Sequence, residues 1–164
     1  MNTTDMTTEG DDAIVISRTF NAPPRIVFEA WTNADFVKKW WAPKALGAQM
    51  VSCEADVREG GGYRYVIQSG DQPPFAFSGN YIEVSAPSRL VYTQAFEPMA
   101  DAGYATVTVT FEAVGANQTR MVSHERYPTA EVREMVLSTG MEKGMRITMD
   151  QLDELVSELQ AAGE

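Results

Sequence analysis

Histidine, cysteine and positive charge are scarce in this chain, and each shortage excludes a class of function. The 164 residues contain one histidine, His124, and one cysteine, Cys53. A structural zinc site uses four such ligands, and a single cysteine cannot form an internal disulfide. We therefore expect no metal, no cofactor and a reducing compartment, which makes the cytoplasm the expected location.

Basic residues are also too few for two common partners. Thirteen Lys and Arg residues stand against 23 Asp and Glu residues, so the formal net charge is −10. Nucleic acids and anionic membrane surfaces attract clustered positive charge, and a membrane-spanning helix needs about 20 consecutive apolar residues. We expect neither a nucleic-acid partner nor membrane insertion. Residues 1–12 are acidic and have no apolar run, so we predict a disordered tail and not a signal peptide.

The apolar residues, 44% of the chain, follow periods that predict one domain over residues 13–162. Alternation predicts a first strand over 14–20, and helical spacing, with Asn33 as a cap, predicts two short helices up to Trp41. Residues 48–127 then alternate β-rich runs with turns that contain Gly, Pro or Asn. This pattern predicts antiparallel strands joined by hairpins, about seven in all with the first.

After Pro128 the apolar residues recur every three or four positions and predict one helix of about thirty residues. Gly140 and Gly144 interrupt this helix and indicate a bend, a close approach to the sheet, or space left for something else. The predicted order is β-α-α-β-β-β-β-β-β-α. It indicates an α+β fold in which a curved antiparallel sheet wraps around the long C-terminal helix, a shape that commonly encloses an apolar cavity.

Six short motifs carry a family resemblance: ISRTFNAP (16–23), VFEAWT (27–32), WWAP (40–43), DVREGG (56–61), FSG (77–79) and RLVY (89–92). In this order and spacing they resemble the family related to the C-terminal domain of the activator of heat-shock protein 90 ATPase. That family belongs to the START-related, or SRPBCC, group, so the resemblance implies the helix-grip fold. Many members have Gly-Trp early in the last helix, where this chain has Gly144 and Met145. Ligand properties are therefore not carried over from the tryptophan-bearing relatives.

Few residues offer catalytic chemistry. His124 lies in a predicted strand without a nucleophile motif, and Glu54, Asp56 and Arg58 alternate along one strand face, which is typical of a solvated charged patch. We therefore predict no catalytic residue. Some helix-grip proteins are enzymes that use a polar group inside the cavity, and under that alternative Ser123, His124 or Glu125 would be the candidate.

Aromatic and methionine side chains favour a binding function instead. Large aromatic residues fall on the predicted strands, and Met141, Met145 and Met149 recur every four residues on the last helix, where flexible side chains can adapt to an apolar partner. The resemblance implies that Ser123 and Glu125 are the rarer polar groups on the concave face. We predict a small hydrophobic ligand, with the Trp40-Trp41 segment and residues 97–103 at the entrance. The predicted ligand-binding residues are Trp40, Trp41, Tyr65, Phe77, Tyr81, Tyr92, Met121, Met141 and Met145.

The resemblance leaves alternatives to this binding function open. It implies a chaperone partner as a second hypothesis, and a cavity-based enzyme as a third. Exposed strands and loops are also compatible with a homodimer, although the sequence favours no particular surface.

Overall fold

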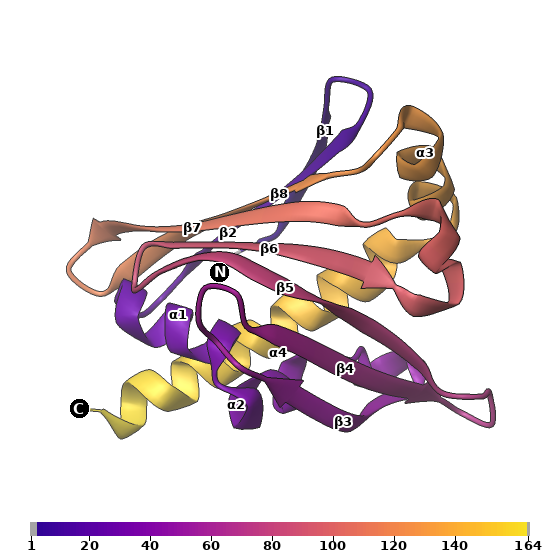
Figure 1. The fold of residues 1–164 in the computed structure, drawn as a ribbon. Coiled ribbons are helices and arrows are strands. Elements are labelled where there is room, and N and C mark those ends of the chain that lie inside the picture. The colour runs from indigo at the N-terminus through magenta and orange to yellow at the C-terminus, as the bar shows by residue number, and fades with distance from the viewer. Residues whose placement is uncertain (1–2, 164) are drawn as a thin grey trace.

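One curved antiparallel sheet partly encloses a long C-terminal helix, as Figure 1 shows. Across residues 3–163, the part of the chain that the computed structural model describes, the sheet has eight strands in the order β1-β2-β8-β7-β6-β5-β4-β3. The sheet stays open, because β1 and β3 form its two edges. The strands are β1 (Asp5–Glu9), β2 (Ala13–Phe20), β3 (Ala48–Ala55), β4 (Gly62–Ser69), β5 (Phe75–Ser85), β6 (Arg89–Phe96), β7 (Ala105–Gly115) and β8 (Gln118–Arg126).

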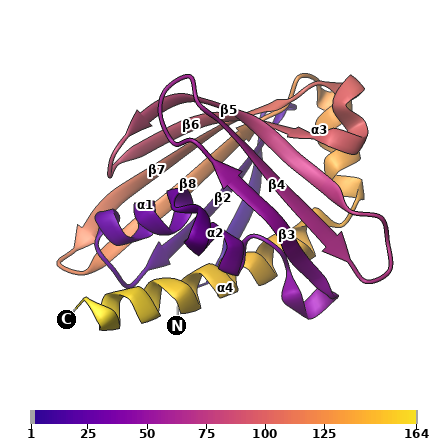
Figure 2. The ribbon, with the colours of Figure 1, turned by 60° about the horizontal axis from the view of Figure 1, so that its bottom comes forward.

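The helices lie on the concave side and at one end of the sheet. The two predicted short helices are present, and the side chain of Asn33 caps the second by accepting a hydrogen bond of 3.0 Å from the Asp35 N–H. Figure 2 shows both of them under the sheet beside α4, and α3 at the opposite end. The helices are α1 (Pro24–Thr32), α2 (Ala34–Trp40), α3 (Ala130–Ser138) and α4 (Met141–Ala162), with 3-10 turns η1 (Lys44–Leu46) and η2 (Glu97–Ala102).

The predicted disordered tail is wrong for residues 5–9, which form strand β1 at the edge of the sheet. Met6 pairs with Ile16 of β2. Thr4, just before the strand, is held by two arginines that are distant in the sequence: Arg18 donates a 2.9 Å hydrogen bond to its hydroxyl, and Arg146 donates to its carbonyl. An edge strand needs backbone pairing and not apolar side chains, so a low apolar content does not exclude it. Residues 1 and 2 of the predicted tail lie outside the described residues.

The predicted single C-terminal helix is in fact two helices. Gly140 separates α3 from α4 and adopts a left-handed conformation with φ of +78°. Glycine reaches this region without the steric cost that a Cβ atom brings, so the chain can turn sharply there. Of the three alternatives for these glycines, the bend applies at Gly140, while Gly144 lies within the regular α4 helix. The α+β helix-grip class, with the sheet around a C-terminal helix, is confirmed despite the extra strand and the helix break.

The core is densely packed at the end of the sheet where α1 lies. Phe28 of α1 packs edge-on against Phe111 of β7, with ring centroids 5.4 Å apart. Leu152 and Val156 of α4 are fully buried in the same cluster as Val27. At the other end of α4 the side chains are only partly buried, because α1 does not extend there. The fold therefore fills one half of the concave face and leaves space in the other.

Candidate functional site

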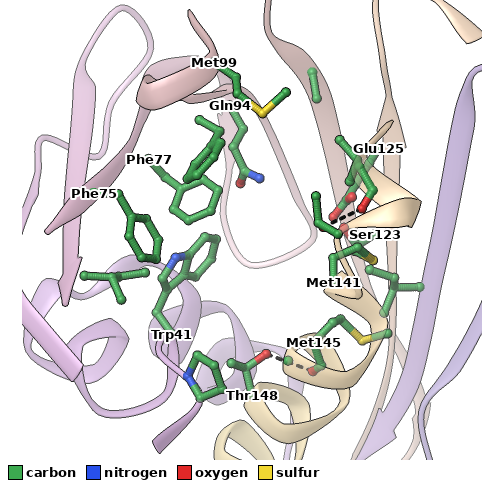
Figure 3. A pocket seen from close by; sticks show the side chains of 18 of the residues that line it. Trp41, Phe75, Phe77, Gln94, Met99, Ser123, Glu125, Met141, Met145 and Thr148 are labelled. Carbon is green, nitrogen blue, oxygen red and sulfur yellow. Dashed lines mark hydrogen bonds between the residues drawn. The ribbon is translucent and has the colours of Figure 1, made fainter. Parts of the chain in front are cut away.

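That space is a cavity of about 510 Å³ between the sheet and the N-terminal half of α4. Its volume lies within the range of about 300–1,000 Å³ that is usual for small-molecule sites. Figure 3 shows aromatic side chains on one wall, polar groups of β8 facing them across the space, and methionines of α4 beside those groups. The cavity is therefore mainly apolar, with Ser123 and Glu125 on one side and the Gln94 amide on the side of the aromatic wall.

The aromatic wall comes from β5, β6 and the segment after α2. Phe77 contacts Phe96 and Trp41, with ring centroids 5.2 Å and 6.4 Å apart, and Phe75 lies 5.5 Å from Phe96. Residues 75 and 77 share a face because side chains alternate along a strand. The result is a continuous aromatic surface that can cover one side of a flat or extended apolar molecule.

The opposite wall is flexible. Met141, Met145 and Met149 lie one turn apart on α4 and all line the cavity, as does Gly144 between them. Thr148 also lines it, but its hydroxyl donates a 2.8 Å hydrogen bond to the Met145 carbonyl and is thus satisfied within the helix. Unbranched thioether side chains adopt many rotamers, so this wall can adjust to ligands of different shape.

Three polar residues of the lining stand close together at β8 and just after it. Ser123 is 3% exposed, and Glu125 accepts a 2.8 Å hydrogen bond at Oε1 from the Tyr127 hydroxyl. Glu125 lies deep inside the protein, and its remaining exposed surface faces the cavity. Burial raises the pKa of Glu125, against the opposing effects of the Tyr127 hydrogen bond and the neighbouring His124. The predicted inward direction of Ser123 and Glu125 is confirmed.

Seven of the nine predicted ligand-binding residues line this cavity: Trp40, Trp41, Phe77, Tyr92, Met121, Met141 and Met145. Trp40 is almost fully buried, and its indole N–H donates a 2.9 Å hydrogen bond to the Ala30 carbonyl, so it is a fixed part of the wall. Trp41 is less buried and contacts both the aromatic wall and the neighbouring strand β4. That these residues bind a ligand stays a prediction.

The other two predicted residues, Tyr65 and Tyr81, lie outside the cavity. They share a hydrogen bond and pack in a tyrosine cluster, in which Tyr63 has its ring centroid 4.8 Å from Tyr65 and 5.6 Å from Tyr81. Trp41 lies 5.0 Å from Tyr65 and borders both the cavity and this cluster. Strand alternation correctly predicted that Tyr65 and Tyr81 point inward. Trp41 lies between them and the cavity, so the two tyrosines contact one another and do not line the cavity.

Several lining residues were missed by the sequence reasoning. Phe75 and Tyr127 follow the alternation of Phe77 and Glu125, so the strand period was a usable signal for them. Val132 and Val136 belong to the apolar stripe predicted after Pro128, but their place in the cavity wall depends on the turn at Gly140 that separates α3 from α4. The predicted entrance segment 97–103 forms η2 and contributes Met99, Ala102 and Gly103 to the lining.

The remaining candidates lie outside the cavity. His124 points to the other face of the sheet, where Nε2 lies 2.8 Å from Glu9 Oε2 on β1. Asp56 and Arg58 form an exposed ion pair, with 2.8 Å between Oδ2 and Nε. Partial burial raises the pKa of the Cys53 thiol to about 11, so this cysteine is a poor nucleophile at neutral pH.

Two further observations concern residues 3–163 as a whole. No three His, Cys, Asp or Glu side chains within that range gather closely enough to hold a metal ion. Within the same range, no helix combines the length and the apolar character needed to cross a membrane.

Comparison with known proteins extends these observations. The model of the family described as "Activator of Hsp90 ATPase homolog 1-like protein" matches residues 21–157. A crystal structure of a protein from Rhodobacter sphaeroides is 21% identical with a TM-score of 0.85, covering 94% of this chain and 99% of that one. A protein from Nitrosomonas europaea is 24% identical with a TM-score of 0.81, covering 93% and 99%.

An Hsp90 activator from Plasmodium falciparum has the same fold at a greater distance. It is 23% identical with a TM-score of 0.56, and the match covers 71% of this chain and 73% of that one. A search of curated proteins found no match.

Proposed function

The chain belongs to the activator of Hsp90 ATPase homolog 1-like family, and from its cavity we propose that it binds a small hydrophobic molecule between the sheet and α4. The observation that carries the proposal is the unfilled, mainly apolar space of about 510 Å³ in a chain that otherwise packs densely. Protein interiors normally leave few voids larger than a water molecule, so a space of this size is unusual and favours a binding function.

The lining supplies enough apolar contact for useful affinity. A ligand that buries roughly 300 Å² of apolar surface gains about 7.5 kcal/mol at about 25 cal/mol per Å². Micromolar binding corresponds to about 8 kcal/mol, so apolar contact supplies a large part of the favourable free energy, and hydrogen bonds must help to offset the cost of association. Binding needs no chemical step, and among the described lining residues Glu125 is the single Asp or Glu.

The test is a binding titration with Nile red, a neutral fluorescent probe, on protein stripped of co-purifying compounds. Met145→Trp places an indole in the cavity and is expected to weaken binding at least tenfold, because it occupies ligand volume. Met135→Trp is the matched control, since Met135 lies 38% exposed on α3 and does not line the cavity. Failure of Nile red and of lipid, polyketide and aromatic competitors to bind would overturn the proposal. So would equal binding by the two variants.

A chaperone partner is the second candidate, and the similarity to an Hsp90 activator supports it. The experiment is an ATPase assay of the purified chaperone with and without this protein, with a pull-down in parallel. Stimulation together with capture would favour this function, and the absence of both would remove it. The same assay with Met145→Trp, which fills the cavity, tells whether any chaperone interaction depends on that cavity.

A further inference from the structure

The charge inside the cavity has one sign. Glu125 is the only Asp or Glu among the lining residues that the structure describes, and no Lys, Arg or His is among them. A ligand carboxylate or phosphate would therefore meet a like charge without a compensating cation, which is unfavourable at low dielectric. Hydrophobic anions such as fatty acids are thus poorly matched to this cavity.

The polar groups at β8 also have unused hydrogen-bonding capacity. Within residues 3–163, the Ser123 hydroxyl has no hydrogen-bond partner although the residue is 3% exposed, and the second carboxylate oxygen of Glu125 is likewise without one. Both residues line the cavity and lie on the same side of it in Figure 3. Both residues line the cavity, so these oxygens can accept hydrogen bonds from a ligand bound there.

We propose that the ligand is an apolar molecule with one protonated amine, whose ammonium group lies against Glu125 and Ser123 while its apolar part covers the aromatic wall. This inference rests on the proposed function. An ammonium group has three donors and the opposite charge, so it can pair with the free oxygen of Glu125 and also reach the Ser123 hydroxyl. A neutral alcohol could donate to the same oxygen, but without the charge.

The surroundings of Glu125 agree with this assignment. Tyr63, Tyr92 and Tyr127 interact electrostatically with Glu125, and burial raises the pKa of all three, so they stay neutral near pH 7. His124 is its chain neighbour but faces Glu9 on the other side of the sheet. No cation of the protein therefore competes for the carboxylate among the described lining residues.

The test compares three ligands of similar shape by isothermal titration calorimetry at neutral pH: 2-naphthylmethylamine, 2-naphthylmethanol and 2-naphthoate. We expect the amine to bind at least tenfold more tightly than the alcohol, and the carboxylate to bind most weakly. Glu125→Gln should bring the amine and the alcohol to within about twofold of each other. Glu112→Gln is the control, because it removes the same charge from an exposed position of β7 and so measures the general attraction of an acidic protein for a cation.

The outcomes separate the two proposals. If none of the three ligands and no Nile red binds, the proposed function fails. If the alcohol binds but the amine binds no more tightly, or if Glu125→Gln leaves their ratio unchanged, only the amine inference is overturned. Should the variant not fold, the wild type supplies a second test, because protonation of Glu125 at low pH removes the charge that pairs with the ammonium group. Burial raises the pKa of this carboxyl, so the ratio of amine to alcohol affinity should be lower near pH 4 than near pH 8, and an equal ratio at the two pH values would contradict the inference.

Discussion

The unequal packing along α4 predicts that two truncations on one helix have very different effects on stability. Leu152 is fully buried in the dense half of the core, whereas Met145 is partly buried and borders the cavity. Leu152→Ala removes three carbon atoms, or about 2.4 kcal/mol of transfer free energy at about 0.8 kcal/mol each. The void left behind adds to this loss, so we expect a total of about 3–4 kcal/mol.

Met145→Ala should reduce the free energy of unfolding by less than about 1 kcal/mol. The methionine already faces empty space, so its removal enlarges an existing cavity and loses few contacts. In a chain of this length about 1 kcal/mol corresponds to roughly 2–4 °C in Tm, so Leu152→Ala should lower Tm by roughly 6–16 °C and Met145→Ala by less than about 4 °C.

Urea denaturation of ligand-free protein, followed by far-UV circular dichroism, measures both changes directly. Wild-type protein and Met135→Ala, a truncation at an exposed position of α3, serve as references. If Met145→Ala destabilises the protein as strongly as Leu152→Ala, the space beside Met145 is filled by protein atoms in solution. The reasoning from an open cavity would then be refuted.

Three further predictions test other features of the structure. Gly79→Ala should destabilise the protein by about 1–3 kcal/mol in urea unfolding, because a Cβ atom would lie 1.8 Å from the Thr93 carbonyl oxygen of β6 and the backbone would have to move; an unchanged midpoint would contradict this close approach. Cys53 should react with iodoacetamide at pH 8 at least tenfold more slowly in the folded than in the unfolded protein, because its pKa is raised to about 11; equal rates would refute the assigned burial. Because burial raises the pKa of Glu125 in the folded state, the native protein holds its proton to higher pH than the unfolded chain, so stability falls as pH rises above about 4.5. Glu125→Gln should accordingly stabilise the protein at pH 7 and have little effect near pH 4, which urea titrations at both values would show; a loss of stability at pH 7 would contradict the sign.

Much of the fold was readable from local periodicity. The alternation of Val107, Val109 and Phe111 with threonines predicted β7, and the structure places these three side chains in the core. The same rule gave the inward direction of Ser123 and Glu125. Strand β1 was not readable in this way, because it depends on pairing with β2 and on Arg146, which lies far away in the sequence.

The site was readable only in part, for a related reason. The strand period predicts which face of the sheet a residue occupies. It does not predict which side chains of the helices and loops cover that residue on the concave face. Tyr65 and Phe77 both point inward, yet the ring of Trp41 borders a tyrosine cluster on one side and the cavity on the other. The contribution of α3 likewise depends on the turn at Gly140.

The sequence by itself determined the α+β class, the family and the faces of the strands, because these follow from short-range periods and from motifs in a fixed order. Only the tertiary structure decided that α1 fills one half of the concave face and that the other half stays open. It also placed Glu125 in the cavity as the single charged residue of the described lining, with Tyr127 as its hydrogen-bond donor. Cavities and isolated charges are set by distances between elements far apart in the chain, and no local pattern encodes those distances.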